Sequence, residues 1–221
     1  MSKSLTPYML ALGPIVMMVG FMMWPVPDDV VGQAAVDILK DADMNMILVS
    51  GFLTGTGVLM MFGSLFLLSQ DLMANSGKMQ RDMLLMSRMG VMFAFTVFYL
   101  FFATSMESAW LVQEGREGFT PEEDNDVALT VTNIGNHIWG SMPLAWGTAL
   151  ILLGAASVTG NNTPKETIEW VYALPAVAGL CLMSTYLTDL DVFFFVALFC
   201  GLPIGIMLLT GHLKIPGSES E

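Results

Sequence analysis

The sequence contains little charge, little histidine and little cysteine. Charged residues make up 13% of its 221 residues, with only 8 Lys+Arg, and there are 2 histidines and 2 cysteines. So few basic residues cannot form the positive stripe of a nucleic-acid-binding protein. Cys181 and Cys200 are too few to staple a small secreted domain. The sequence therefore excludes nucleic acid as a partner and a disulfide scaffold as the fold.

Catalytic and cofactor-binding patterns are missing as well. Two histidines cannot build a three-histidine zinc site or an imidazole-ligated copper centre. The sequence has no Gly-x-Ser-x-Gly elbow, no phosphate-binding loop and no dinucleotide fingerprint. Both cysteines lie among apolar neighbours, where a thiol is inert. We therefore expect no enzymatic activity, no cofactor and no dedicated metal site.

Apolar residues, by contrast, are abundant and arranged in long runs. They make up 54% of the chain, and the runs approach twenty residues, the length of a helix that crosses a bilayer. This pattern predicts an all-α, polytopic transmembrane bundle in a single membrane domain, residues 1–215, followed by a disordered polar tail, 216–221. Six spans are expected, at about 8–26, 44–69, 89–112, 130–157, 170–188 and 191–211.

The basic residues predict how the chain is oriented. An even number of spans places both termini on one side of the membrane, and six of the eight basic residues fall on that side. Because basic residues accumulate in cytoplasmic loops, both termini are expected in the cytoplasm and the chain in the cell membrane. Lys40 and Arg116 fall on the outer side. The six inner residues are Lys3, Lys78, Arg81, Arg88, Lys165 and Lys214.

Acidic residues gather in the predicted outer loops. An acidic surface keeps the rim of a membrane protein soluble, and it also raises the local concentration of cations. On the second interpretation, Asp189 and Asp191 are candidate residues of an outer vestibule. The acids expected outside are Asp28, Asp29, Asp37, Asp41, Asp43, Glu114, Glu117, Glu122, Glu123, Asp124, Asp126, Asp189 and Asp191.

The first outer loop carries an amphipathic pattern. Its apolar residues recur at helical spacing and its charged residues fall on the other face, as expected for a short helix lying in the membrane interface. The apolar stripe consists of Val30, Val31, Ala34, Ala35 and Ile38.

One ionisable residue, Glu107, lies inside a predicted span, about 7 Å below the outer interface at a rise of about 1.5 Å per residue. His137 lies at a similar depth in the next span, which runs back antiparallel, so the two side chains can meet. Asn133 lies one turn from His137 on the same face, and Asn136 is adjacent. Ionisable groups within a membrane mark a function or a partner. These four residues form the predicted intramembrane polar cluster.

Several interpretations of this cluster are open. Glu107 and His137 can form a coupled stop on a proton or cation path, or a static hydrogen bond that fixes helix packing. Glu107 can also lie simply at the headgroups, at the wetted end of its span. With Asp189 and Asp191, the pair is a geometrically conceivable divalent-cation site.

Two glycine pairs and many methionines remain. Gly51 with Gly55, and Gly201 with Gly205, are spaced by four residues in apolar helices and predict close helix packing, within the chain or against another subunit. The 20 methionines are scattered over every face, which favours adaptable packing over copper binding.

Two functional hypotheses follow. In the first, the chain is a non-catalytic subunit or scaffold that contacts other membrane subunits or a second copy of itself. In the second, it is a small transporter or channel for a cation or proton, with the outer acids as its vestibule and Glu107 with His137 as its gating pair. The first is favoured, because each pattern has an adequate structural explanation.

Overall fold

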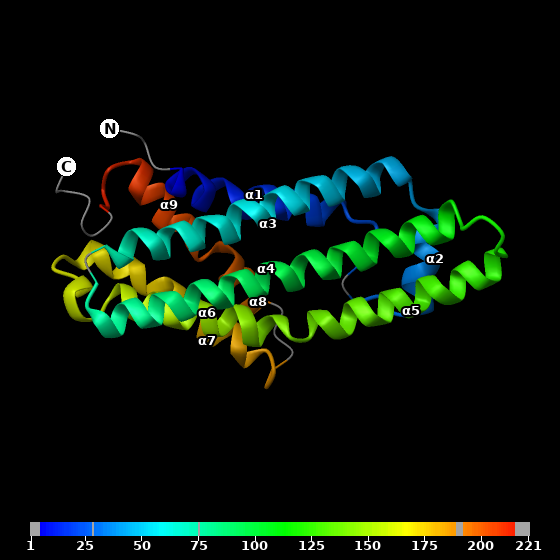
Figure 1. Ribbon diagram of the computed structural model, residues 1–221. Helices are drawn as coiled ribbons and strands as arrows, with labels where there is room; N and C mark the ends of the chain where they lie inside the picture. Colours follow the sequence, from blue (N-terminus) through cyan, green and yellow to red (C-terminus); the bar gives the residue numbers. More distant parts are fainter. Residues whose placement is uncertain (1–4, 28, 75, 189–191, 215–221) are drawn as a thin grey trace. The chain divides into compact units, whose positions relative to one another are not determined.

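The computed structural model describes residues 5–27, 29–74, 76–188 and 192–214, and this part of the chain is helical with no strand. The predicted tail, 216–221, and the vestibule residues Asp189 and Asp191 lie outside the described residues. The helices, with 3-10 helices marked η, are α1 (Thr6–Met23), α2 (Gln33–Asp41), α3 (Met44–Met73), α4 (Lys78–Gln113), α5 (Pro121–Trp139), α6 (Met142–Ser157), η1 (Gly160–Asn162), η2 (Thr167–Ala173), α7 (Leu174–Ser184), α8 (Val192–Phe199) and α9 (Gly201–Leu209) (Figure 1).

Six helical segments of the described chain are long and apolar enough to cross a membrane, which confirms the predicted number of spans. The protein is thus an all-helical, multi-pass membrane protein. Helix α4 begins at Lys78, well before the predicted span at 89, because helical hydrogen bonding continues into polar sequence where hydropathy has already fallen. The segments are Thr6–Met23, Met44–Met73, Lys78–Gln113, Pro121–Ser157, Thr167–Ser184 and Val192–Leu209.

The chain forms two compact units, which are described separately. Unit 1 comprises Met1–Ile15, Val58–Phe95 and Met142–Glu221, and unit 2 comprises Val16–Gly57 and Thr96–Ser141. Helices α1, α3 and α4 each contribute residues to both units.

In unit 1, α6 and α7 pack backbone against backbone. A Cβ atom added at Gly147 would lie 2.6 Å from Met183 Cγ and 3.0 Å from the carbonyl oxygen of Gly179, and one added at Gly154 would overlap the backbone nitrogen of Ala176. No side chain larger than that of glycine fits at these positions. The missing side chains let the two helices approach closely and gain van der Waals contact.

Helix α9 packs against α1 in the same unit. A Cβ atom added at Gly205 would lie 2.7 Å from the backbone nitrogen of Ala11 and 2.9 Å from the carbonyl oxygen of Pro7. One turn earlier, a Cβ atom at Gly201 would lie 2.9 Å from a methyl group of Leu10. The second predicted glycine pair thus lies at a contact between helices.

Polar contacts close the end of unit 1 where α3 turns into α4. The side-chain amide of Gln80 donates to the carbonyl of Thr159, beyond α6, and its oxygen accepts the backbone N–H of Gly77 at 2.8 Å. Nearby, the Asn162 amide donates to the Ser76 hydroxyl at 3.0 Å. These bonds join the α3–α4 connection to the segment that follows α6.

In unit 2, α1 and α3 pack through small residues. A Cβ atom at Gly20 would overlap Thr54, and one at Gly57 would overlap the backbone of Met17. The buried Ser50 hydroxyl donates to the carbonyl of Gly20 at 2.7 Å. An aromatic cluster from α1, the residue that follows it, α4 and α5 packs in the same unit. Its rings meet edge-on or tilted, as aromatic pairs prefer. The cluster consists of Phe21, Trp24, Phe98, Phe101, Phe102 and Trp139.

Helix α2 forms in the first predicted outer loop, but its buried face differs from the predicted stripe. Ala35, Val36 and Leu39 are buried, and Val36 packs with residues of α4 and α5, whereas Val31 and Ala34 are exposed. The apolar face of α2 is therefore covered by protein in unit 2. Its position at the membrane surface stays a prediction.

Candidate functional site

The structure places all four residues of the predicted polar cluster on exposed positions of unit 2. Glu107 lies on α4, and Asn133, Asn136 and His137 lie on α5. Within the described part of the chain, no hydrogen bond or ion pair joins Glu107 to His137. The structure therefore does not bring the expected pair together.

Helix geometry explains why the pair stays apart. The contact between α4 and α5 is made by Ser108, whose hydroxyl lies 3.1 Å from the Ala128 carbonyl and accepts a hydrogen bond from Thr132 at 2.9 Å. Successive helical residues are about 100° apart. Glu107, one residue before Ser108, consequently points away from this contact.

The same argument applies on α5. Gly135 is buried against Thr104 of α4, where an added Cβ atom would overlap the Thr104 hydroxyl. His137 follows Gly135 by two residues, about 200° around the helix, and so lies on the far face. The expectation that the two side chains meet is therefore wrong, because a similar depth in neighbouring helices does not fix which face each residue occupies.

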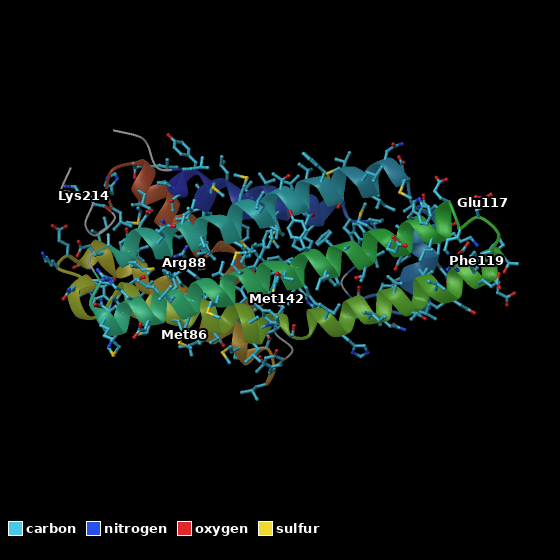
Figure 2. The ribbon with its side chains drawn as sticks, viewed as in Figure 1. Met86, Arg88, Glu117, Phe119, Met142 and Lys214 are labelled. Carbon is cyan, nitrogen blue, oxygen red and sulfur yellow. The ribbon has the colours of Figure 1, made fainter. Side chains whose placement is uncertain are left out.

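Unit 2 carries most of the acidic residues of the protein. Twelve of the 20 Asp+Glu belong to it, with only Lys40 and Arg116 as bases. Glu117, for example, lies with Phe119 on the turn that joins α4 to α5 (Figure 2). Ten of these acids are exposed, and none of the ten makes an ion pair within the described residues. They are Asp29, Asp37, Asp41, Asp43, Glu107, Glu114, Glu117, Glu122, Glu123 and Asp126.

One acid of unit 2, Asp124, is buried and forms an ion pair. Asp124 is 3% exposed, and its carboxylate accepts the Arg116 side-chain Nε–H at 2.6 Å and the Arg116 backbone N–H at 2.9 Å. The Arg116 guanidinium also stacks 3.9 Å above the ring of Phe119. Gly115, with φ of 72°, makes the left-handed bend that brings this backbone to the carboxylate. Arg116 thus shapes the turn and forms its ion pair with Asp124, not with any of the ten exposed acids.

Gln113, at the end of α4, holds α2 in place. Its side-chain amide donates to the carbonyl oxygens of Leu39 at 2.6 Å and Ala42 at 3.0 Å, at the C-terminal end of α2. These carbonyls have no partner inside the helix, so an amide from outside stabilises the helix end. The sequence analysis missed this contact, because a glutamine at the end of a span carries no distinctive pattern.

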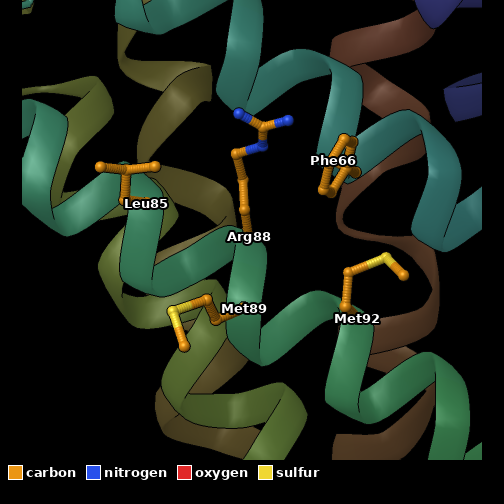
Figure 3. A pocket seen from close by; sticks show the side chains of 5 residues that line it. All are labelled: Phe66, Leu85, Arg88, Met89 and Met92. Carbon is orange, nitrogen blue, oxygen red and sulfur yellow. The ribbon is translucent and has the colours of Figure 1, made fainter.

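Unit 1 contains a groove beside Arg88. Its volume is about 410 Å³, and Arg88 and Phe66 form part of its lining (Figure 3). The Arg88 guanidinium stacks 3.9 Å from the centre of the Phe66 ring. Its Nε atom is buried without a hydrogen-bond partner, and Nη1 lies 4.0 Å from the Met73 sulfur. The sequence had marked Arg88 only as an inner-side base. Leu85, Met89 and Met92 complete the lining.

Within the described residues, no three His, Cys, Asp or Glu side chains lie close enough together to hold a metal ion. Cys181 and Cys200 are both free thiols. The structure thus offers two features for a functional argument, the exposed acidic surface of unit 2 and the Arg88 groove of unit 1. Comparison with known proteins adds no further feature, since no family model, no curated protein and no solved structure matches this chain.

Proposed function

We propose that the protein is a non-catalytic subunit or scaffold of a membrane assembly, and that the exposed acidic surface of unit 2 contacts its partner. The observation that carries this proposal is the set of ten exposed acids without an ion pair among the described residues. A surface of one charge sign steers an oppositely charged partner and selects against the wrong one.

Two uncharged stretches of the sequence indicate which parts of the helices lie in the membrane. Eighteen uncharged residues, 89–106, separate Arg88 from Glu107, and as a helix they cover about 27 Å. The hydrocarbon core is about 30 Å thick. Residues 138–157, after His137, are likewise uncharged. On this basis Glu107 and His137 lie at the outer headgroups, where exposed polar side chains are hydrated.

The same assignment orients the protein. Arg88 then lies near the inner headgroups, on the side that also holds Lys78, Arg81, Lys165 and Lys214. Because basic residues accumulate in cytoplasmic loops, this assignment puts the protein in the cell membrane with both termini in the cytoplasm. The acidic surface of unit 2, including the exposed side of α2, then faces outward. Its expected partner is a basic segment of another membrane or extracytoplasmic subunit.

The test is partner retention after purification from native membranes in mild detergent. Glu114→Gln with Glu117→Gln removes two exposed charges of unit 2, and Asp82→Asn with Glu219→Gln removes two elsewhere. Native mass spectrometry should find a partner on the wild type and on the second variant, and at least tenfold less on the first, because the charges are the recognition element. A folded wild-type chain that purifies alone, or equal retention by both variants, would contradict the proposal.

The alternative is a small cation- or proton-coupled transporter, which the same acidic surface favours by concentrating cations. The exposed, unjoined positions of Glu107 and His137 count against an intramembrane gate. Proteoliposomes under a pH gradient separate the two functions. For a scaffold, wild type and Glu107→Gln show the same background flux. Flux by the wild type that disappears in Glu107→Gln, and persists in Glu114→Gln, would favour the transporter.

A further inference from the structure

Arg88 has no carboxylate partner among the residues that the structure describes. Its guanidinium contacts an aromatic ring and a thioether, and one of its nitrogens is buried without a hydrogen-bond partner. A partly buried cation is costly unless an anion or strong acceptors surround it. The cation–π contact with Phe66 offsets part of this cost but supplies no hydrogen-bond acceptor.

Unit 1 has four described acids, Asp71, Asp82, Glu166 and Glu169, and none of them forms an ion pair with Arg88. Asp71 accepts a hydrogen bond from Thr6 at 3.3 Å, and Glu169 accepts the backbone N–H groups of Lys165 and Glu166. Among the described residues, the one ion pair is that of Arg116 with Asp124, in the other unit. The Arg88 guanidinium therefore has charge and hydrogen-bonding capacity that no described carboxylate uses.

The rest of the groove is apolar. Leu85, Met89 and Met92 lie at positions i−3, i+1 and i+4 from Arg88 on α4, and all three are exposed, Met89 to 73%. Phe66 closes the side toward α3 (Figure 3). Methionine side chains are flexible and polarizable, so they adapt to a chain with many conformations. One cation at the edge of an adaptable apolar surface matches a ligand with an anionic head and a hydrocarbon tail.

We propose that this groove binds an anionic phospholipid, with its phosphate on Arg88 and an acyl chain along Met89 and Met92, on the membrane side of Arg88. A guanidinium presents paired N–H donors that match phosphate oxygens. A free phosphate ion would use the cation but not the apolar walls. Arg88 directly precedes the uncharged stretch 89–106, which is where headgroup phosphates meet a membrane helix.

Arg81 serves as the matched control. It lies seven residues earlier on the same helix and is exposed, and its Nε donates to the Met73 carbonyl at 3.3 Å. It does not line the groove. Replacing Arg81 removes the same charge from α4, so a purely electrostatic attraction of lipid to the helix would respond equally to both substitutions.

The experiment titrates phosphatidylglycerol into the detergent-purified full chain and counts bound lipid by native mass spectrometry. Phosphatidylcholine and inorganic phosphate are the comparison probes. The wild type and Arg81→Gln should bind phosphatidylglycerol at least tenfold more tightly than Arg88→Gln, as expected for the loss of a charge-assisted hydrogen bond. The affinity of Arg88→Lys should be intermediate, because the lysine ammonium keeps the positive charge but lacks the paired N–H donors of a guanidinium.

Other outcomes overturn the proposal. Equal binding of phosphatidylglycerol and phosphatidylcholine would show that the negative charge of the lipid does not contribute to affinity. Displacement of the lipid by inorganic phosphate, one for one, would identify a site for a free anion. If Arg88→Gln does not fold, Met89→Trp takes its place, because the exposed Met89 tolerates a larger side chain that fills the groove. A folded Met89→Trp variant that binds phosphatidylglycerol like the wild type would also contradict the proposal.

Discussion

Units 1 and 2 share three helices but are held together differently. Unit 1 relies on helix contacts in which glycine leaves no room for a side chain, as between α6 and α7, with polar bonds concentrated where α3 turns into α4. Side-chain hydrogen bonds join helices in both units, for example from Ser87 to the Ala149 carbonyl in unit 1. Unit 2 differs in the hydrogen bonds from Gln113 that hold the end of α2, and in the ion pair at the α4–α5 turn, the one ion pair among the described residues.

The difference follows the composition of each unit. In hydrocarbon, helices gain little from burying apolar surface, so close van der Waals contact between small residues decides their association. In water, polar surface is tolerated, and hydrogen bonds between side chains add specificity. We infer that unit 1 is organised for lipid surroundings and that much of unit 2 is organised for water. The predictions below test this contrast, from the largest expected effect to the smallest.

The largest effect is expected from Gly154→Ala in unit 1. Its methyl group would overlap the backbone nitrogen of Ala176, so α6 and α7 must separate. We expect a loss of about 3 kcal/mol in unfolding free energy, at the upper end of the usual cost of overpacking. Reversible unfolding in mixed micelles measures this loss.

Gly55→Ala is the control for that substitution. A Cβ atom at Gly55 would lie 3.6 Å from the Tyr99 hydroxyl, an ordinary contact distance. Alanine is also the better helix former, by about 1 kcal/mol in soluble helices. Stability should therefore stay equal or rise slightly. If Gly154→Ala and Gly55→Ala behave alike, the packing argument is wrong.

An intermediate effect is expected from Asp124→Asn in unit 2. The substitution keeps the shape but removes the charge that accepts both N–H groups of Arg116. We expect about 2 kcal/mol of destabilisation, since hydrogen bonds to charged groups contribute more than neutral ones. Asp126→Asn, at an exposed site on the same helix, should change stability by less than about 0.5 kcal/mol. Equal unfolding free energies for the two variants would show that the ion pair does not stabilise the turn.

The smallest effect is expected from Gln113→Ala. The two hydrogen bonds to α2 disappear, and a net loss of about 1 kcal/mol should be confined to that helix. Hydrogen exchange of residues 33–41 should accelerate, while exchange in unit 1 stays unchanged. Gln33→Ala removes exposed side-chain hydrogen bonds with Asn125 and Asp37 and is the control. Exchange that rises equally throughout the chain would rule out a local role for Gln113.

Much of the fold could be predicted, because hydropathy is a property of consecutive residues. The six membrane-crossing segments follow from this property. The start of α4 at Lys78 also agrees with the sequence, because residues 78–88 contain no helix breaker before the third span. The buried face of α2 was less predictable, since α2 buries Val36 in place of Val31. Glycine pairs spaced by four residues also do not include all the close helix contacts. Gly147 with Gly154, and Gly13 with Gly20, are seven residues apart, a spacing that also returns to the same helix face.

By itself, the sequence determined that this protein is helical, crosses a membrane and carries its negative charge in particular segments. Only the tertiary structure decided that Glu107 and His137 face away from the α4–α5 contact, and that Arg88 borders a groove with no carboxylate partner among the described residues. The physical reason is that length and polarity are summed along the chain. The direction in which a side chain points, in contrast, depends on how each helix is rotated about its axis when it packs. Neighbouring residues of a helix point about 100° apart, so such a rotation decides which residue meets the neighbouring helix.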